Sequence, residues 1–311
     1  MRLVSVRREG GLRLGGLLRG GPVERVLDLN AADASIPADL RSFLEAGDLA
    51  WKRASDLLGS SARPRSARTR HPAHALLPLD EARLGPVVPN PSKIVCIGLN
   101  YRDHAAETGQ ALPEVPTVFA KYPNVLIGAG EAIVAPRASD QVDYEAELAF
   151  VIGRRGRHVP EERAAEHVAG YTIFNDVTAR DVQRRTPQWT LGKSFDTFGP
   201  LGPALVTPDE VPDPHALAIR LTVDGETLQS SSTAGMVFSV PRLVAHLSAV
   251  MTLEPGDVVS TGTPAGVGFV RDPPRFLRPG QTVRIEIEGL GILENPVVAE
   301  DEARGPRAVE D

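Results

Sequence analysis

The chain has 311 residues, of which 42% are hydrophobic, and a formal net charge of −6, which is enough for one large domain with a small companion and a sizeable buried core. The negative balance argues against a nucleic-acid partner, and no apolar run approaches the ~20 residues of a membrane-spanning helix. The single cysteine, Cys96, excludes an internal disulfide and a cysteine metal cluster, and the opening residues lack the apolar core of a signal peptide, so a cytoplasmic protein is expected.

Residues 1–70 are predicted to form a small α+β domain. Short β-forming pieces alternate with glycine pairs over residues 1–30, which is typical of a small meander. Residues 36–58 have apolar positions at helical spacing. That spacing predicts one helical face made of Leu40, Phe43, Leu44 and Leu49.

A second, larger domain is predicted from residue 92 to residue 299, after a connector at 71–91 and before a charged tail at 300–311. Within it, short strands recur between Gly and Pro turns, and the best helix candidates are 160–168 and 240–251. This spacing favours a mainly β domain closed on itself as a roll or barrel over a doubly wound sheet.

The first candidate site follows the strand expected at 93–97. His104 and Glu107 are three residues apart, so on a helical turn they share a face, where the carboxylate can orient and charge the imidazole as a general base requires. The same spacing is common on exposed helices, so an ordinary surface pair is the alternative.

Three carboxylates form the second candidate site. Glu145 and Glu147 stand one residue apart in an apolar run, where they would share a strand face, and two adjacent carboxylates repel unless a proton or a cation lies between them. Asp176 ends a second short apolar strand. An oxygen-only set suits Mg²⁺, Mn²⁺ or Ca²⁺ better than Zn²⁺. The alternative is that the two glutamates line the wet face of an edge strand.

Arg180 and Gln183 lie one helical turn apart, in a segment that begins two residues after Asp176. Arginine suits a substrate carboxylate and glutamine a carbonyl, although a surface helix has the same pattern. The segment around Lys193 has a glycine and a serine on either side, but Pro187 stands where a phosphate loop needs glycine, so a nucleotide site is excluded.

Two further features single out residues for a site. Basic residues are almost all arginine, and the four lysines that remain suggest positions where a compact ammonium is needed: Lys52, Lys93, Lys121 and Lys193. The glycine-rich segment 260–268 is predicted to be a tight loop that brings backbone N–H groups and the Thr263 hydroxyl close to a ligand.

In their order, these segments resemble the fumarylacetoacetate hydrolase family. The matching stretches are 93–107, 143–148, 170–183, 188–203 and 254–277. The resemblance implies an α+β, mainly β fold, in which a β-roll or barrel like the family's C-terminal domain follows a small α+β N-terminal domain. It also implies that Mg²⁺ or Mn²⁺ is bound by Glu145, Glu147 and Asp176.

The resemblance further implies roles for the remaining candidates. His104 would be the base that acts on water, with Glu107 as its helper, and Lys193 would polarise a substrate oxygen. Arg180, Gln183 and Thr263 would contact the substrate. The family resemblance, together with the apolar stretch 236–240, leads us to expect a homodimer.

One departure narrows the expected function. The enzymes that give the family its name carry a fourth acidic ligand seven residues before the base, where this chain has Ile97. This resembles the three-ligand branch of acylpyruvate hydrolases, oxaloacetate decarboxylases and 2-hydroxyhepta-2,4-diene-1,7-dioate isomerases.

We therefore expect a Mg²⁺-dependent hydrolase that cleaves a C–C bond in an acylpyruvate-type 2,4-dioxo acid to give pyruvate and an acid, because the His104–Glu107 pair is present. The alternatives are the isomerase or decarboxylase of the same branch and, from another class, a non-catalytic protein that binds a metal and a 2-oxo acid.

Overall fold

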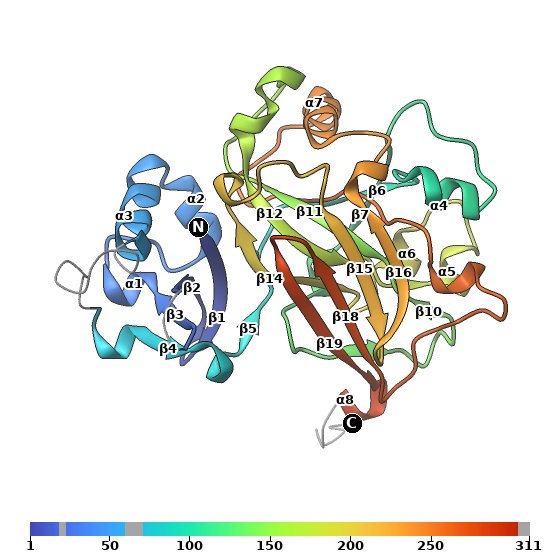
Figure 1. Cartoon of the computed structure of the whole chain (residues 1–311), viewed down its shortest axis with the longest axis horizontal. Coiled ribbons are helices and arrows are strands. Elements are labelled where there is room, and N and C mark those ends of the chain that lie inside the picture. Colours follow the sequence, from blue (N-terminus) through green and yellow to red (C-terminus); the bar gives the residue numbers. More distant parts are fainter. Residues whose placement is uncertain (19–22, 60–70, 304–311) are drawn as a thin grey trace, which may run out of the picture.

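The computed structural model describes residues 1–18, 23–59 and 71–303. Figure 1 shows a small N-terminal lobe, coloured blue to cyan, beside a larger β-rich lobe. Residues 60–70 at the end of the predicted N-terminal domain, and 304–311 of the predicted tail, lie outside the described residues. Among the described helices, none has the length and apolar character needed to cross a membrane.

The N-terminal lobe is a small sheet covered by short helices. Its strand β2 pairs antiparallel with both β1 and β3, so the meander predicted over residues 1–30 is confirmed. Two short strands from the predicted connector extend this sheet, because β4 pairs with β3 and β5 pairs with β1. The elements are β1 (Arg2–Arg8), β2 (Gly11–Leu18), β3 (Arg25–Asp28), α1 (Leu29–Ala32), α2 (Leu40–Glu45), α3 (Asp48–Gly59), β4 (Leu76–Pro78), β5 (Leu84–Gly85) and the 3₁₀ helices η3 (Ala73–Ala75) and η4 (Leu79–Glu81).

The helical segment predicted over 36–58 is two helices. Gly47 adopts a φ of +69° between α2 and α3, a conformation that glycine reaches without a steric penalty. Leu40, Phe43 and Leu44 are buried as predicted, but Leu49 is 63% exposed. Its predicted place on that face is wrong, because the break at Gly47 resets the helical register and α3 turns Ala50 and Ala54 inward instead.

The two lobes share one sheet. β1 pairs antiparallel with β14, with Leu3 opposite Leu205, so the N-terminal meander continues the main sheet of the larger lobe. The strand order in this sheet is β4-β3-β2-β1-β14-β12-β11-β17-β6-β7. The new strands are β6 (Ile94–Gly98), β7 (Thr117–Lys121), β8 (Leu126–Ile127), β11 (Ala146–Ile152), β12 (Val168–Asn175), β14 (Gly199–Val206) and β17 (Val258–Ser260).

A second sheet, in the order β16-β15-β18-β19-β9, completes the larger lobe, and a short β10–β13 pair lies at the site. The mainly β, α+β fold is thus confirmed. The helix predicted at 240–251 is α7, and the one at 160–168 is a 3₁₀ helix. The elements are β9 (Ile133–Ala135), β10 (Val142–Asp143), β13 (Thr178–Ala179), β15 (Ala218–Val223), β16 (Glu226–Ser232), β18 (Thr282–Ile287), β19 (Gly291–Ala299), α4 (Arg102–Glu107), α5 (Arg180–Gln183), α6 (Thr190–Lys193), α7 (Val240–Val250), α8 (Glu300–Ala303), η5 (Pro123–Val125), η6 (Glu161–His167), η7 (Pro208–Glu210), η8 (Thr233–Gly235) and η9 (Gly268–Val270).

Strand β11 lies at the centre of the main sheet, between β12 and β17. All seven of its residues are buried, and six of them are apolar. A strand covered on both faces is expected to read as a continuous apolar run. The one charged residue in it, Glu147, is therefore a buried carboxylate, and so the strand cannot be the wet edge strand of the alternative interpretation.

The apolar stretch 236–240 is covered within this chain. Met236 and Val240 are buried, and the residues between them are half-buried. The Val237 N–H donates to the Asn100 carbonyl at 2.7 Å. The stretch therefore anchors the segment that carries His104, and the homodimer expected from the sequence stays a prediction.

Gly170→Ala should destabilise the protein. A Cβ at Gly170 would lie 2.4 Å from the Val206 carbonyl oxygen, which is backbone on the neighbouring strand β14. Such overpacking costs about 1–3 kcal/mol. The control is Gly59→Ala, because a Cβ at Gly59 would meet nothing within 4 Å. Urea unfolding should show a loss for the first variant and none for the second; equal stabilities would contradict this packing.

Candidate active site

The three predicted carboxylates come together where β11 begins and the neighbouring antiparallel strand β12 ends. Glu147 lies in β11, Glu145 directly precedes that strand, and Asp176 directly follows β12. The Asp176 N–H donates to the Glu145 carbonyl at 3.0 Å. Carboxylate oxygens of all three residues lie within 4.8 Å of one another, and all three residues are buried.

Buried cations from three separate elements surround two of these carboxylates. The Lys193 ammonium donates to Glu145 Oε2 and to Asp176 Oδ2, both at 2.7 Å. Lys121 donates to Asp176 Oδ1 at 2.5 Å. Arg180 Nη2 donates to Glu145 Oε1 at 2.5 Å. Burial raises the pKa of the Glu145 carboxyl, but Lys193 and Arg180 outweigh it and lower that pKa to about 2, so Glu145 is ionised at neutral pH.

Glu147 has a different environment. Its Oε2 accepts hydrogen bonds from the Ser260 hydroxyl and from the Gly262 N–H at 2.9 Å, and among the described residues it forms no ion pair. Burial, together with the charges of Asp176 and Glu145, raises the pKa of the Glu147 carboxyl well above its usual range. Glu147 is therefore the carboxylate that lacks a positive partner.

This charge distribution fits a divalent cation. Four buried carboxylates face three buried cations in what we call the inner cluster: Asp143, Glu145, Glu147, Asp176, Lys121, Lys193 and Arg180. The excess negative charge falls on Glu147. Oxygen ligands without cysteine or histidine suit a hard ion. Glu145, Glu147 and Asp176 could thus hold Mg²⁺ or Mn²⁺.

His104 and Glu107 pair as predicted. His104 Nδ1 lies 2.7 Å from Glu107 Oε1 in α4, and Glu107 Oε2 accepts the Gly266 N–H at 2.8 Å. Gly266 has a φ of +107°, and a Cβ there would lie 2.2 Å from the Leu228 carbonyl oxygen. Only glycine allows this approach. The predicted tight loop at 260–268 therefore holds Glu107 in place.

A cavity of about 310 Å³ contains most of the predicted site residues. His104 lines it together with the three carboxylates, and so do eight more polar residues: Thr108, Gln110, Arg180, Gln183, Arg184, Thr186, Lys193 and Thr263. Glu107 is not part of the lining, and it contacts His104 through the Nδ1 atom. Three aromatic residues complete the walls: Phe119 and Trp189, whose ring centroids are 5.5 Å apart, and Phe269.

Arg180 lies in the cavity wall, and three of its five N–H groups donate to the protein. Its Nε donates to Asp143 Oδ2 at 2.8 Å and its Nη1 to Gln183 Oε1 at 3.1 Å, in addition to the contact with Glu145. Thr263 is also engaged, since its hydroxyl donates to the Ala146 carbonyl at 3.0 Å. Arg180 therefore holds Glu145 in place, and its predicted contact with the substrate stays a prediction.

Sequence patterns missed two members of the inner cluster. Lys121 precedes Asp176 by 55 residues in the chain, and its only signal was that lysines are rare in this sequence. Asp143 precedes Glu145 by two residues, yet nothing in the sequence shows that it holds Arg180. Gly192, which invited the phosphate-loop comparison, serves packing instead, because a Cβ there would lie 2.5 Å from the Gln183 nitrogen.

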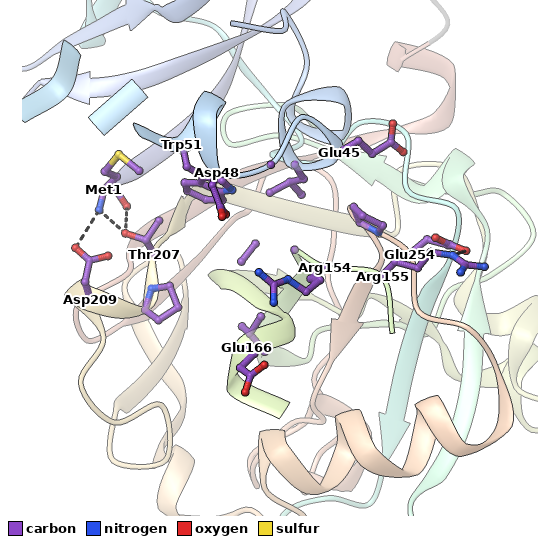
Figure 2. A pocket seen from close by; sticks show the side chains of 17 residues that line it. Met1, Glu45, Asp48, Trp51, Arg154, Arg155, Glu166, Thr207, Asp209 and Glu254 are labelled. Atoms are coloured by element: carbon purple, nitrogen blue, oxygen red, sulfur yellow. Dashed lines mark hydrogen bonds and ion pairs between the residues drawn. The ribbon is translucent and has the colours of Figure 1, made fainter. Parts of the chain in front are cut away.

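A larger cavity of about 740 Å³ lies elsewhere, between the N-terminal lobe and the main lobe. Figure 2 shows its lining, with Trp51 on one side and Arg154 on the other. Two pairs of its charged groups contact each other: the Met1 amino group lies 3.7 Å from Asp209, and Arg155 lies 3.1 Å from Glu254. None of the predicted site residues lines it, so we place the chemistry in the smaller cavity.

Glu147→Gln should weaken Mn²⁺ binding by more than ~10-fold, since even changes outside the ligand shell commonly cost ~10–100-fold. The metal-free variant should be as stable as the wild type, because glutamine removes the repulsion from Glu145 and Asp176 and still accepts the bonds of Ser260 and Gly262. Calorimetric titration and thermal unfolding measure the two effects.

The control for that experiment is Glu166→Gln, an exposed glutamate that pairs with Arg163. It should leave Mn²⁺ affinity unchanged. If Glu147→Gln bound Mn²⁺ within about threefold of the wild type, the carboxylate cluster would not be the metal site.

Comparison with known proteins identifies the family. The family model "Fumarylacetoacetate (FAA) hydrolase C-terminal" matches residues 93–298. The chain is 47% identical over 275 residues to a mitochondrial oxaloacetate tautomerase of Xenopus laevis, covering 88% of this chain and 82% of that protein. It is 43% identical over 302 residues to a human protein of the same name, covering 96% and 92%. Both relatives are named as mitochondrial, and the cytoplasmic location of this chain stays a prediction.

Solved structures agree with this match. A fumarylacetoacetate hydrolase from Exiguobacterium antarcticum superposes with a TM-score of 0.79 at 35% identity, covering 96% of this chain and 99% of that one. A 5-carboxymethyl-2-hydroxymuconate delta-isomerase from Mycobacterium smegmatis gives 0.73 at 37%, with the same coverage. The chain belongs to the fumarylacetoacetate hydrolase family.

Proposed function

We propose that the protein is a divalent-metal-dependent enzyme that interconverts the keto and enol forms of an oxaloacetate-like 2-oxo acid. The observation that carries the proposal is that one cavity combines a carboxylate cluster suited to a metal, a buried lysine and a His–Glu pair. Relatives named as oxaloacetate tautomerases and isomerases favour this chemistry.

The proposed reaction needs a group that stabilises negative charge on the 2-oxo oxygen and a group that moves a proton. A divalent cation held by the three carboxylates would polarise the substrate's carbonyl as a Lewis acid. Lys193 would add a fixed ammonium next to the same oxygen, since it already bridges Glu145 and Asp176.

His104 would carry the proton. Its Nδ1 is held by Glu107, which leaves Nε2 to accept a proton from C3 of the substrate while the C–H electron pair forms the C2–C3 double bond. Glu107 would stabilise the imidazolium, and His104 would then return the proton to the oxygen to give the enol. No atom is gained or lost, and no water is consumed.

The acylpyruvate hydrolase favoured by the sequence finds less support than its alternative. Hydrolysis needs the same His104–Glu107 pair to activate water, so the pair alone does not separate the reactions. The relatives reported above are named as tautomerases, an isomerase and a fumarylacetoacetate hydrolase, and none as an acylpyruvate hydrolase. We therefore propose enol chemistry on a 2-oxo acid as the activity.

With Mg²⁺ present, the protein should accelerate the loss of the ultraviolet absorbance of enol-oxaloacetate above the buffer rate, and EDTA should abolish the effect. The same preparation should be assayed for pyruvate release from acylpyruvates and for CO₂ release from oxaloacetate. Faster acylpyruvate cleavage than enol conversion would reverse the proposal in favour of the hydrolase.

His104→Ala should lower enol conversion by ~10²–10⁴, the usual contribution of a general base. Its Mn²⁺ affinity should hardly change, because the imidazole is not among the clustered carboxylate ligands. The control is His74→Ala, an exposed histidine of the N-terminal lobe. Activity of the His104 variant within threefold of the wild type would show that another group moves the proton.

A further inference from the structure

Arg184 lines the cavity, and among the described residues it has no carboxylate partner. Arg180, one helical turn earlier, is buried and bound to Asp143 and Glu145. Arg184 lines the same cavity at its exposed rim. Within the part of the chain that the structure describes, no carboxylate lies within ion-pair distance of its guanidinium.

Phe269 holds the Arg184 guanidinium in place. The Cζ atom of Arg184 lies 4.5 Å from the centroid of the Phe269 ring, and the Cζ atom of Arg180 lies 4.4 Å from the same centroid. A guanidinium that contacts an aromatic ring keeps N–H donors at its edge for a planar anion. The shared ring also keeps Arg184 close to the inner cluster, because Arg180 contacts Glu145 directly.

The charges favour a substrate with two carboxylates. The inner cluster holds four carboxylates and three cations, so a bound divalent ion would leave it with a single net positive charge. This single positive charge would balance the negative charge of the first carboxylate of a 2-oxo acid. A second carboxylate needs another cation, and among the described residues of the cavity wall Arg184 is the arginine without a carboxylate partner.

We propose that Arg184 binds the distal carboxylate of a 2-oxo dicarboxylate and thereby sets the substrate class. This assignment rests on the proposed function, since it assumes that the 2-oxo acid end lies at the carboxylate cluster. Arginine forms two parallel hydrogen bonds with a carboxylate. Substrates that end in a methyl or an ester group would lose those bonds.

The neighbouring Arg185 provides a matched control. It pairs with Asp181 at 3.7 Å, and its side chain is 65% exposed. It does not line the cavity. Arg184→Gln and Arg185→Gln remove the same charge at adjacent positions, so a general loss of positive potential affects both variants, whereas a specific contact affects only the first.

The kinetic test compares oxaloacetate with its 4-methyl ester, which has the same carbon chain but no distal charge. Arg184→Gln should lower kcat/KM for oxaloacetate by ~10–100-fold, as expected for lost hydrogen bonds between charged groups, and change it less than threefold for the ester. For oxaloacetate, the kcat/KM of Arg184→Lys should fall between those of the wild type and Arg184→Gln, because lysine keeps the charge without the planar guanidinium. Arg185→Gln should behave as the wild type.

The binding test does not depend on turnover. Calorimetry on Mn²⁺-loaded protein compares malate with 2-hydroxybutyrate, which carries a methyl group in place of the distal carboxylate. The wild type and Arg185→Gln should prefer malate by ~10-fold or more, and Arg184→Gln should lose that preference. Phe269→Leu should lose part of it, since the guanidinium then has no ring to rest on.

The two proposals fail separately. A wild type without a preference for malate, or an Arg184→Gln variant that keeps it, would overturn the assignment of Arg184. If the wild type did not convert enol-oxaloacetate but Arg184→Gln still abolished the malate preference, the proposed reaction would be wrong and the dicarboxylate site would stand.

Discussion

The central constraint on this structure is electrostatic: carboxylates are buried side by side at the end of the main sheet. Two like charges 4 Å apart repel by about 4 kcal/mol at an effective dielectric constant near 20, so such a cluster persists only when cations or protons balance it. Lys121 comes from edge strand β7, Arg180 from α5 and Lys193 from α6. Ion pairs with the buried carboxylates thus hold together elements that are far apart in sequence.

The loop at 260–268 contacts both the carboxylate cluster and the His104–Glu107 pair. Its Gly262 N–H binds Glu147, and its Gly266 N–H binds Glu107, the partner of His104. Asn100 fixes the other side, because its side-chain amide donates to the Thr261 carbonyl at 2.7 Å and its oxygen accepts the Phe238 N–H at 2.8 Å. The His104–Glu107 pair and the carboxylate cluster are therefore positioned by a common backbone segment.

Local patterns in the sequence predicted those parts of the site that lie close together in the chain. Glu145 and Glu147 were recognisable in the sequence as charged residues within an apolar run. His104 and Glu107 were recognisable as a pair at helical spacing. The prediction failed where a residue's position depends on contacts between distant segments or on a break in a helix. Lys121 meets Asp176 although 55 residues separate them in the chain and three strands separate β7 from β12 in the main sheet. Leu49 points outward because a single glycine breaks the helix.

Arg184 shows a further limit of local patterns. In the sequence it is one of two adjacent arginines, and only the three-dimensional structure separates them: one contacts Phe269 in the cavity, and the other pairs with Asp181. The mainly β fold, by contrast, followed from the spacing of turns and from the family resemblance together. The continuity of the main sheet across both lobes could not be predicted in this way, because the pairing of β1 with β14 joins residues about two hundred positions apart.

The claim on which the rest depends is that the unbalanced charge at Glu147 marks a divalent-cation site. Crystals soaked in Mn²⁺ and oxalate would test it by anomalous scattering at the manganese edge. We predict a single strong peak bounded by Glu145, Glu147 and Asp176, with the Lys193 ammonium beside it. A peak elsewhere, or none at this cluster at millimolar Mn²⁺, would contradict the account.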